Sequence, residues 1–233
     1  MSNRKDKFVT QREDRDAAKA RRRGEPNLTR AAPNRQTKPT ILIVCEGENT
    51  EPSYFDSFRL SSATVESYGG RKQPVNVVKH AIYLASQKKY DEVWCVFDKD
   101  DISDEDFNDA IDQAEAAGFK VAYSNQAFEY WFILHFEDHK GGPMPRADYH
   151  NRINGYINPL GAYYDGKKSK TVSSAFFDAL DGFDIVKKET RIQLAVNRAG
   201  RIHGRCKKAG VSPAKSESCT TVYQLIKRFL KYR

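Results

Sequence analysis

An α/β fold with a mainly parallel sheet is the architecture that this sequence predicts. From residue 40 to residue 137, short runs rich in β-branched and aromatic residues alternate with longer segments of helical periodicity. Two of the short runs, 41–45 and 93–97, are apolar throughout, which is typical of strands covered by helices on both faces. Such alternation leads to parallel strands joined by helical crossovers. A chain of 233 residues is long enough for one well-buried domain and a smaller lobe.

The α/β region begins with a predicted strand over 40–45. Gly47 then permits a turn. Thr50 and Pro52 mark the start of a helix over about 51–60, because a hydroxyl caps free amides and proline is tolerated in the first turn. After a polar loop around residues 69–70, we expect a short strand over 75–78, a helix over 79–89, a strand over 91–97, a helix over 103–117 ending at Gly118, a strand over 119–124 and an aromatic-rich helix over 127–137.

Three parts of the chain differ in composition. Residues 1–38 combine charge, Asn, Pro and Gly with few large apolar residues, which predicts a disordered basic arm. Residues 39–140 make up the predicted α/β domain. The Gly-Gly-Pro-Met-Pro segment at 141–145 breaks the alternation, so residues 141–233 are predicted to form a mostly helical, basic C-terminal lobe.

Composition also excludes several classes of protein. The sequence has no apolar run of about 18 residues and no apolar segment at its polar N-terminus, so neither a membrane span nor a secretory signal is predicted, and we expect a cytoplasmic protein. The four cysteines show no C-x-x-C pair and no histidine at zinc-finger spacing, which disfavours a disulfide framework or structural zinc. No serine or cysteine nucleophile stands in a recognisable triad context, and no phosphate-binding GxxxxGK[ST] loop is present.

Charge is segregated along the chain. The net charge of +8 is the sum of +7 for residues 1–38, −10 for 39–184, +7 for 185–208 and +4 for 209–233. An acidic middle between basic ends suits a metal centre whose polyanionic substrate is held by Lys and Arg, since phosphate contacts supply most sequence-independent affinity for nucleic acid. A solvated surface with a basic tail is the alternative.

One basic segment of the C-terminal lobe has helical periodicity. Its apolar residues, from Ile192 to Cys206, fall on one stripe at 100° per residue, and its cations fall on the adjoining stripe. A docked helix of this kind could contact DNA or RNA phosphates, although a solvated face explains the pattern as well. The six candidate nucleic-acid-binding residues are Lys187, Arg191, Arg198, Arg201, Arg205 and Lys208.

Three acidic residues follow the two most apolar strands. Glu46 comes directly after the first strand, and Asp98 and Asp100 come at the end of the strand over 91–97. Neighbouring parallel strands deliver their terminal side chains to one crevice at the carboxyl edge, so these three carboxylates can converge. In an extended segment Asp98 and Asp100 also point the same way. Because three carboxylates repel unless a cation or protons neutralise them, we predict a site for Mg²⁺ or Mn²⁺ and hence phosphate chemistry.

Three further residues are candidates with competing interpretations. Glu51 could join the metal site, or could complement the dipole at a helix start. Asn125 and Glu129 follow the strand over 119–124 at the same edge, and are candidate accessory residues. Asn125 could instead be a helix N-cap. The aspartates could likewise cap the helix near Ser103, a duty that suits Asp101 and Ser103 better than Asp98.

The acidic motifs, in this order and context, resemble the Toprim domain of topoisomerases, primases and overcoming-lysogenization-defect nucleases. The sequence more closely resembles the RloB family, which is similar to the Toprim subunit of the AbiL abortive-infection system. Residues 40–233 carry this resemblance, and its motifs are VCEGENTEP at 44–52, FDKD at 97–100, SN at 124–125 and FEYW at 128–131.

The resemblance implies a Toprim-like (Rossmann-like) fold and a prokaryotic antiphage protein, often encoded beside an ABC-type ATPase. It also implies that Glu46 is the Toprim glutamate and that Asp98 and Asp100 are metal-binding aspartates. The leading hypothesis is therefore a Mg²⁺-dependent nuclease that cleaves DNA or RNA in abortive infection under the control of an ATPase partner. The alternative is a non-catalytic nucleic-acid-binding or regulatory subunit of an ATPase defence complex.

Overall fold

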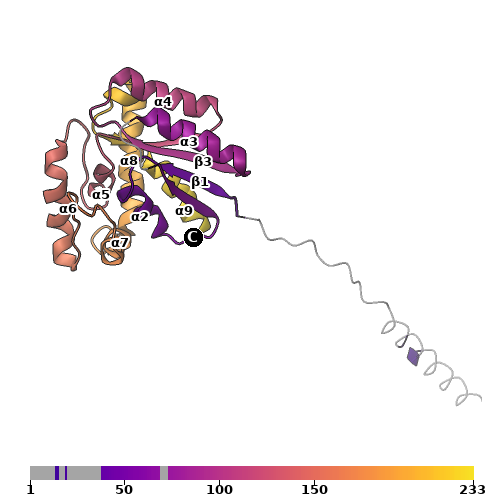
Figure 1. The fold of residues 1–233 in the computed structure, drawn as a ribbon. Coiled ribbons are helices and arrows are strands. Elements are labelled where there is room, and N and C mark those ends of the chain that lie inside the picture. Colours follow the sequence, from indigo (N-terminus) through magenta and orange to yellow (C-terminus); the bar gives the residue numbers. More distant parts are fainter. Residues whose placement is uncertain (1–13, 16–18, 20–37, 69–72) are drawn as a thin grey trace, which may run out of the picture. The chain divides into compact units, whose positions relative to one another are not determined.

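A five-stranded sheet organises the described residues of this computed structural model (Figure 1). The structure describes residues 14–15, 19, 38–68 and 73–233. The strands lie in the order β2 (Ala63–Ser67), β1 (Ile41–Cys45), β3 (Glu92–Asp98), β4 (Lys120–Asn125) and β7 (Cys219–Thr220). Every pair is parallel except β4 with β7. The predicted α/β fold with a mainly parallel, Rossmann-like sheet is confirmed.

The strand order reverses beside β1. The chain passes from β1 to β2 on one side and then returns to place β3 on the other side of β1. In open α/β sheets, such a reversal leaves a crevice at the carboxyl ends of the two strands, because the connections leave in opposite directions. The end of β1 pairs with the end of β3, with Cys45 opposite Val96. The residues that follow these two strands are therefore placed at the crevice.

Helices cover both faces of the sheet (Figure 1). On one face, Leu42 packs with Val77 of α3 (Pro74–Gln87) and Phe107 of α4 (Asp104–Ala116). On the other face, Ile43 lies in a larger apolar cluster with Phe229. That cluster is built from α2 (Thr50–Asp56), α5 (Glu129–Ile133), α8 (Arg191–Lys208) and α9 (Val222–Tyr232), among other segments. The apolar runs are thus buried from both sides, as the sequence predicts.

One strand and the start of the helix after it differ from the prediction. Residues 75–78 were expected to be a strand but form the first turns of α3, which begins with Pro74 at its first position. The strand next to β1 is β2 instead, formed by residues 63–67. Three β-branched valines favour a strand locally, but Val77 and Val78 pack with Ala81 on the buried face of α3, and this tertiary burial overrides local propensity.

Helix ends follow local hydrogen bonds. Ser103 caps α4 as expected, since its Oγ accepts the N–H of Asp106 at 3.1 Å. The aromatic helix is shorter than the expected 127–137, because α5 ends at Ile133 and tighter turns follow. The helix at 51–60 is also shorter and spans Thr50–Asp56.

The C-terminal residues belong to the same compact unit as the sheet. Residues 38–233 cluster as one unit, β7 extends the sheet, and α9 packs beneath it, so the predicted boundary at 140/141 does not separate two units. The remaining elements are η1 (Arg146–Asp148), α6 (Tyr149–Ile157), η2 (Asn158–Leu160), α7 (Ser174–Asp181), the hairpin of β5 (Phe183–Asp184) and β6 (Glu189–Thr190), and η3 (Pro213–Lys215).

Two predicted features fall outside the described part of the chain. The basic arm at 1–38 lies there almost entirely, as does the loop around residues 69–70. Among the helices that are described, none has the length and apolar character needed to span a bilayer.

Candidate metal centre

Glu46 and Asp98 meet where the strand order reverses. Glu46 follows the last residue of β1, and Asp98 is the last residue of β3. The backbone N–H of Asp98 donates to Oε2 of Glu46 at 3.2 Å, so the Glu46 carboxylate is held against the backbone of Asp98. The structure thus places these two residues together at the carboxyl edge, where the sequence predicted them.

Two more carboxylates share this position. Glu51 lies in the first turn of α2 and is only 5% exposed, while Glu129 is the first residue of α5. Repulsion from Glu46, Glu51 and Glu129 acts on Asp98, and Glu51 is itself repelled by Glu46 and Glu129. The candidate site is therefore a group of four carboxylates from four elements of the fold.

Burial and mutual repulsion change the acidity of this group. The pKa of Asp98 is raised well above its ordinary value, first by burial and then by the neighbouring carboxylates. Burial is also the main cause that raises the pKa of Glu51 to about 7. The pKa of Glu46 is raised by burial, while the N–H of Asp98 and the charge of Arg146 oppose the rise. Near neutral pH the group cannot hold four negative charges without a cation or a proton.

One oxygen of this group has no hydrogen-bond partner among the described residues. The backbone N–H of Phe128 donates to Oδ2 of Asp98 at 3.0 Å, but the buried Oδ1 of Asp98 is unpaired. Buried polar atoms are nearly always satisfied, so an orphaned carboxylate oxygen indicates a missing proton, water or ion.

Gly47 and Tyr164 position the other carboxylates. A Cβ atom on Gly47 would lie 2.8 Å from Cδ of Glu51, so a side chain at this position would displace the carboxylate. The hydroxyl of Tyr164 donates to Oε1 of Glu129 at 3.0 Å and lies 3.2 Å from Oγ1 of Thr50. The sequence analysis missed Tyr164. It could not have been found from local sequence, because it lies 35 positions after Glu129.

Asp100 does not share the position of Asp98. Its φ of 38° is left-handed, its carboxylate pairs with Arg146, and its N–H donates to the carbonyl of Gln126 at 3.0 Å. Residues 99 and 100 lie beyond the extended strand, so the alternation behind the expectation that Asp98 and Asp100 point the same way does not reach Asp100. Asp100 instead lines an adjacent pocket of about 370 Å³, together with Glu46, Gln73, Asp101, Ile102, Ser103 and Asp106.

The chemistry of the four carboxylates fits a hard divalent cation. Carboxylate oxygens are the ligands that Mg²⁺ prefers, and Asp98 Oδ1 offers an unpaired one. Within the described part of the chain, however, no three His, Cys, Asp or Glu side chains already surround one point closely enough to hold an ion. Glu46, Glu51, Asp98 and Glu129 are the residues that would hold such a cation.

The side chain of Asn125 forms hydrogen bonds within the fold. Its buried side-chain amide donates to the carbonyl oxygen of Ala214 at 2.7 Å and to that of Pro213 at 3.2 Å. These bonds fasten η3 to the end of β4. The N-cap position of α5 is Phe128, so Asn125 is not the N-cap of that helix. The ligand-orienting role of Asn125 stays a prediction, and it would fall to the side-chain oxygen, because the amide nitrogen is bonded to carbonyl groups.

The basic stripe is confirmed as a helix but not as a row of free cations. In α8 the apolar stripe is buried, yet so is Arg198, whose guanidinium donates to the carbonyl of Leu134 just after α5 at 2.7 Å. Arg198 therefore satisfies a carbonyl that the end of α5 leaves without an intrahelical partner. The guanidinium of Arg191 donates to the carbonyl of Ala179 in α7 at 3.0 Å.

The other four predicted cations are more accessible. Arg201 pairs with Asp138, and Arg205 donates to the carbonyl of Lys140. Lys208 is exposed at the end of α8, whereas Lys187 lies outside the helix in the turn between β5 and β6. Nucleic-acid binding by these residues stays a prediction, but the expected continuous stripe from Lys187 to Lys208 is wrong.

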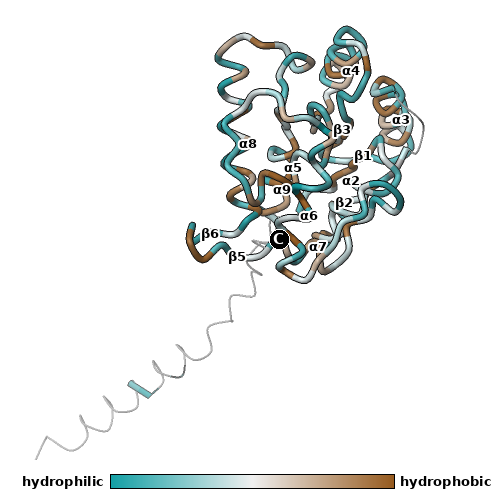
Figure 2. The backbone as a smooth tube through the Cα atoms, turned by 90° about the vertical axis from the view of Figure 1, so that its left-hand side faces the viewer, coloured by the Kyte–Doolittle hydropathy of each residue, from teal (hydrophilic) through white to brown (hydrophobic). Residues whose placement is uncertain are grey.

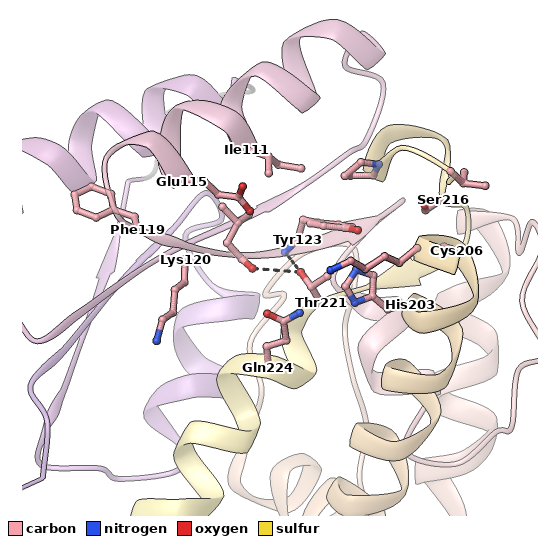
Figure 3. A pocket seen from close by; sticks show the side chains of 14 residues that line it. Ile111, Glu115, Phe119, Lys120, Tyr123, His203, Cys206, Ser216, Thr221 and Gln224 are labelled. Atoms are coloured by element: carbon pink, nitrogen blue, oxygen red, sulfur yellow. Dashed lines mark hydrogen bonds between the residues drawn. The ribbon is translucent and has the colours of Figure 1, made fainter. Parts of the chain in front are cut away.

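A second pocket lies beside β4 and is bordered by α4, α8 and α9 (Figure 3). Its volume is about 440 Å³, and its wall includes a hydrogen bond of 2.9 Å from the N–H of Tyr123 to Oγ1 of Thr221. The lining mixes apolar, cationic and acidic groups: Ile111, Glu115, Phe119, Lys120, Val121, Tyr123, His203, Cys206, Lys207, Val211, Pro213, Ser216, Thr221 and Gln224. None of the four clustered carboxylates lines it.

Fold and site together define a Rossmann-like α/β protein with an acidic centre at the reversal point of a mainly parallel sheet. The family model for RloB-like proteins matches residues 41–229, so the chain belongs to the RloB-like family, as the motifs predicted. No curated protein matches the chain. A comparison with solved structures likewise gives no match.

Proposed function

We propose that the protein is a Mg²⁺-dependent nuclease of Toprim type that cleaves phosphodiester bonds of DNA or RNA in antiphage defence. The buried, unpaired Oδ1 of Asp98 among three further carboxylates is the observation that supports this proposal most strongly. A group of this kind costs folding energy unless it binds a ligand, and strained or repulsive groups of charge cluster at functional sites. Membership of the RloB-like family is consistent with it.

The placement of each side chain supports a role for it in this proposal. Asp98, Glu46 and Glu51 would hold the cation, and Glu129, oriented by Tyr164, would complete the ligand set. Bound Mg²⁺ would supply polarisation of the scissile phosphate and charge stabilisation of the leaving oxygen. Without a cation, Glu51, with a pKa of about 7, can hold a proton at its carboxylate near neutral pH, and it would release that proton when the cation binds.

The test is cleavage of labelled RNA and DNA by the full chain with Mg²⁺, with Mn²⁺ and with EDTA. We expect cleavage that requires the metal and that falls by at least 100-fold, on the order of the loss from removing an important electrostatic group, in Asp98→Ala and Asp98→Asn. The matched control is Asp112→Asn, an exposed aspartate on α4. Equal cleavage by wild type and Asp98→Ala, or cleavage in EDTA, would contradict the proposal.

The second candidate function, a regulatory subunit of an ATPase complex, is favoured by one surface feature. The turn between β5 and β6 projects from the molecule and carries an apolar tip (Figure 2). Ile185 is 83% exposed and Val186 is 85% exposed, beside two exposed lysines, Lys187 and Lys188. Exposed adjacent apolar residues of this kind often mark protein interaction sites.

Co-expression tests this candidate. If the hairpin docks on the ABC-type ATPase that the family resemblance implies, the double variant Ile185→Ser, Val186→Ser would lose co-purification with that ATPase. Wild-type protein that co-purifies with the ATPase but cleaves no nucleic acid with any metal would favour the regulatory function over the nuclease.

A further inference from the structure

We propose that residues 163–170, the lysine loop, bind the substrate of the acidic centre, and that this substrate is an unpaired nucleic-acid strand. The proposal rests on the proposed nuclease function and specifies where and in what form its substrate binds. The lysine loop connects η2 to α7 and has the sequence Tyr-Tyr-Asp-Gly-Lys-Lys-Ser-Lys.

The lysine loop is fixed at the rim of the acidic centre. Its second residue, Tyr164, donates to Glu129 of the carboxylate group at 3.0 Å. Asn154 of α6 holds the backbone of the same residue, because its side-chain oxygen accepts the N–H of Tyr164 and its side-chain nitrogen donates to the C=O of Tyr164, both at 2.9 Å. After the loop, the N–H of Val172 donates to Oγ of Ser53 in α2 at 2.9 Å, two residues from Glu51. The loop is therefore tied to the elements that supply two of the four carboxylates.

Three cations project from this fixed base. The carboxylate of Asp165 accepts the backbone N–H groups of Lys167 and Lys168, each at 3.1 Å, and its carbonyl accepts the N–H of Lys170 at 2.9 Å. The backbone is thus folded around Asp165, while the three lysine side chains are exposed. None of the three ammonium groups forms a salt bridge with a described carboxylate, in contrast to Arg146 or Arg201.

This concentration of cations stands out locally. Residues 39–184 carry a net charge of −10, yet three lysines fall within four positions of the loop. Lysines placed beside an acidic metal centre can neutralise successive phosphates of a polyanion, and this is the contact that supplies sequence-independent affinity. The same cations lower the repulsion between the carboxylates and an approaching phosphodiester.

An exposed aromatic surface begins the loop. Tyr163 is 60% exposed, and the ring of His150 stands edge-on to it with the ring centroids 6.3 Å apart. Exposed aromatic rings beside cations are the combination with which proteins bind unpaired strands, since any base can stack on such a ring. In a duplex, the base faces are already stacked on one another and cannot reach Tyr163.

The depth of the carboxylates favours the same substrate. Oδ1 of Asp98 is buried, and Glu51 is only 5% exposed. A phosphodiester must enter the centre to reach them, which a flexible single strand can do more readily than a duplex, whose backbone is held by the partner strand. The geometry therefore points to single-stranded RNA or DNA, or to an unpaired loop of a folded RNA.

Binding in EDTA tests this inference apart from cleavage. Fluorescence anisotropy of the full chain would be measured with labelled single-stranded RNA, single-stranded DNA and their duplexes across a salt series. We expect the triple variant Lys167→Ala, Lys168→Ala, Lys170→Ala to reduce the salt slope for single strands by about 2, because each phosphate contact contributes about 0.7. Tyr163→Ala should weaken binding about tenfold, whereas Tyr163→Phe should retain it.

The charge-matched control is Lys79→Ala, Lys88→Ala, Lys89→Ala, which removes three exposed lysines from α3 and the residues after it. Equal loss of affinity in the two triple variants would overturn the assignment of the loop, and wild-type binding to duplexes as tight as to single strands would overturn the substrate class. If wild type shows metal-dependent cleavage but the lysine-loop variant binds and cleaves as well as wild type, the nuclease proposal is supported and the role of the loop is refuted. If binding depends on the loop but no protein shows metal-dependent cleavage, the role of the loop is supported and the nuclease proposal is refuted.

Discussion

Replacing Glu51 by glutamine should make the protein more stable at alkaline pH. The folded-state pKa of Glu51 is about 7, compared with an ordinary value of 4.5, so the folded protein holds the Glu51 proton more tightly than the unfolded chain does. Below the unfolded value both states are protonated and no difference arises. As pH rises from 4.5 to about 7, the unfolded chain loses this proton more readily than the folded protein, and the free energy of unfolding falls. A difference of about 2.5 pKa units corresponds to about 3 kcal/mol.

Glutamine is isosteric and carries no charge, so Glu51→Gln removes this loss. In EDTA at about pH 8, the variant should therefore be more stable than wild type by about 3 kcal/mol, which raises Tm by roughly 6–12 °C for a unit of this size. At about pH 4 the two proteins should unfold together. Thermal and urea unfolding across a pH series would measure this, with Glu48→Gln, an exposed glutamate of the same turn, as the control.

Mg²⁺ should reduce the difference in stability between Glu51→Gln and wild type. A cation that binds the ionised carboxylates stabilises the folded wild type by mass action, and more strongly at about pH 8 than at about pH 5, because protonation competes with metal. The variant should gain less from Mg²⁺. Parallel stability curves for wild type and Glu51→Gln, or a variant less stable than wild type at about pH 8, would refute the reasoning that Glu51 is a buried carboxyl under repulsion.

Two further substitutions separate the acidic centre from the structural framework. Gly47→Ala should displace the Glu51 carboxylate and so weaken Mg²⁺ binding in calorimetry at least tenfold, on the order of the loss when a group that supports a metal site is removed; unchanged affinity would show that this carboxylate does not take part. Arg198→Ala should lower the free energy of unfolding in urea by about 1–3 kcal/mol, because it leaves the buried carbonyl of Leu134 unpaired. Arg201→Ala should lower it by less than about 1 kcal/mol, because its ion pair is exposed. Equal losses would contradict the structural role of Arg198.

The positions of Glu46 and Asp98 could be predicted from the sequence because strand periodicity and chain direction determine them. Once β1 and β3 are recognised as neighbouring parallel strands, the residues that follow them must lie at the same edge. The argument from strand alternation does not extend to Asp100, because Asp100 lies two residues beyond the end of β3 and has a left-handed φ. Alternation of side chains is a property of the strand and ends with it.

Periodicity likewise identified the buried face of α8 but not the partners of its cations. The spacing of Arg198 places it beside the apolar stripe, yet its role depends on the carbonyl of Leu134, which lies 64 positions away. Similarly, the valines at 75–78 favour a strand by propensity, and their helical state depends on packing in the core. Such distant partners are set by the fold as a whole, and no local pattern records them.

The charges around the acidic centre bear on how the proposed substrate would lie. The first turn of α4 holds Asp104, Glu105 and Asp106, and Asp106 lines the pocket that contains Glu46, so a polyanion would be repelled there. The lysine loop, by contrast, is tied to Glu129 through Tyr164. Electrostatic steering acts on the difference between such surfaces. If the proposed function is right, a strand that reaches Asp98 would extend over the lysine loop and away from the start of α4, and changing the three lysines to glutamate would weaken single-strand binding in the anisotropy assay more than changing them to alanine.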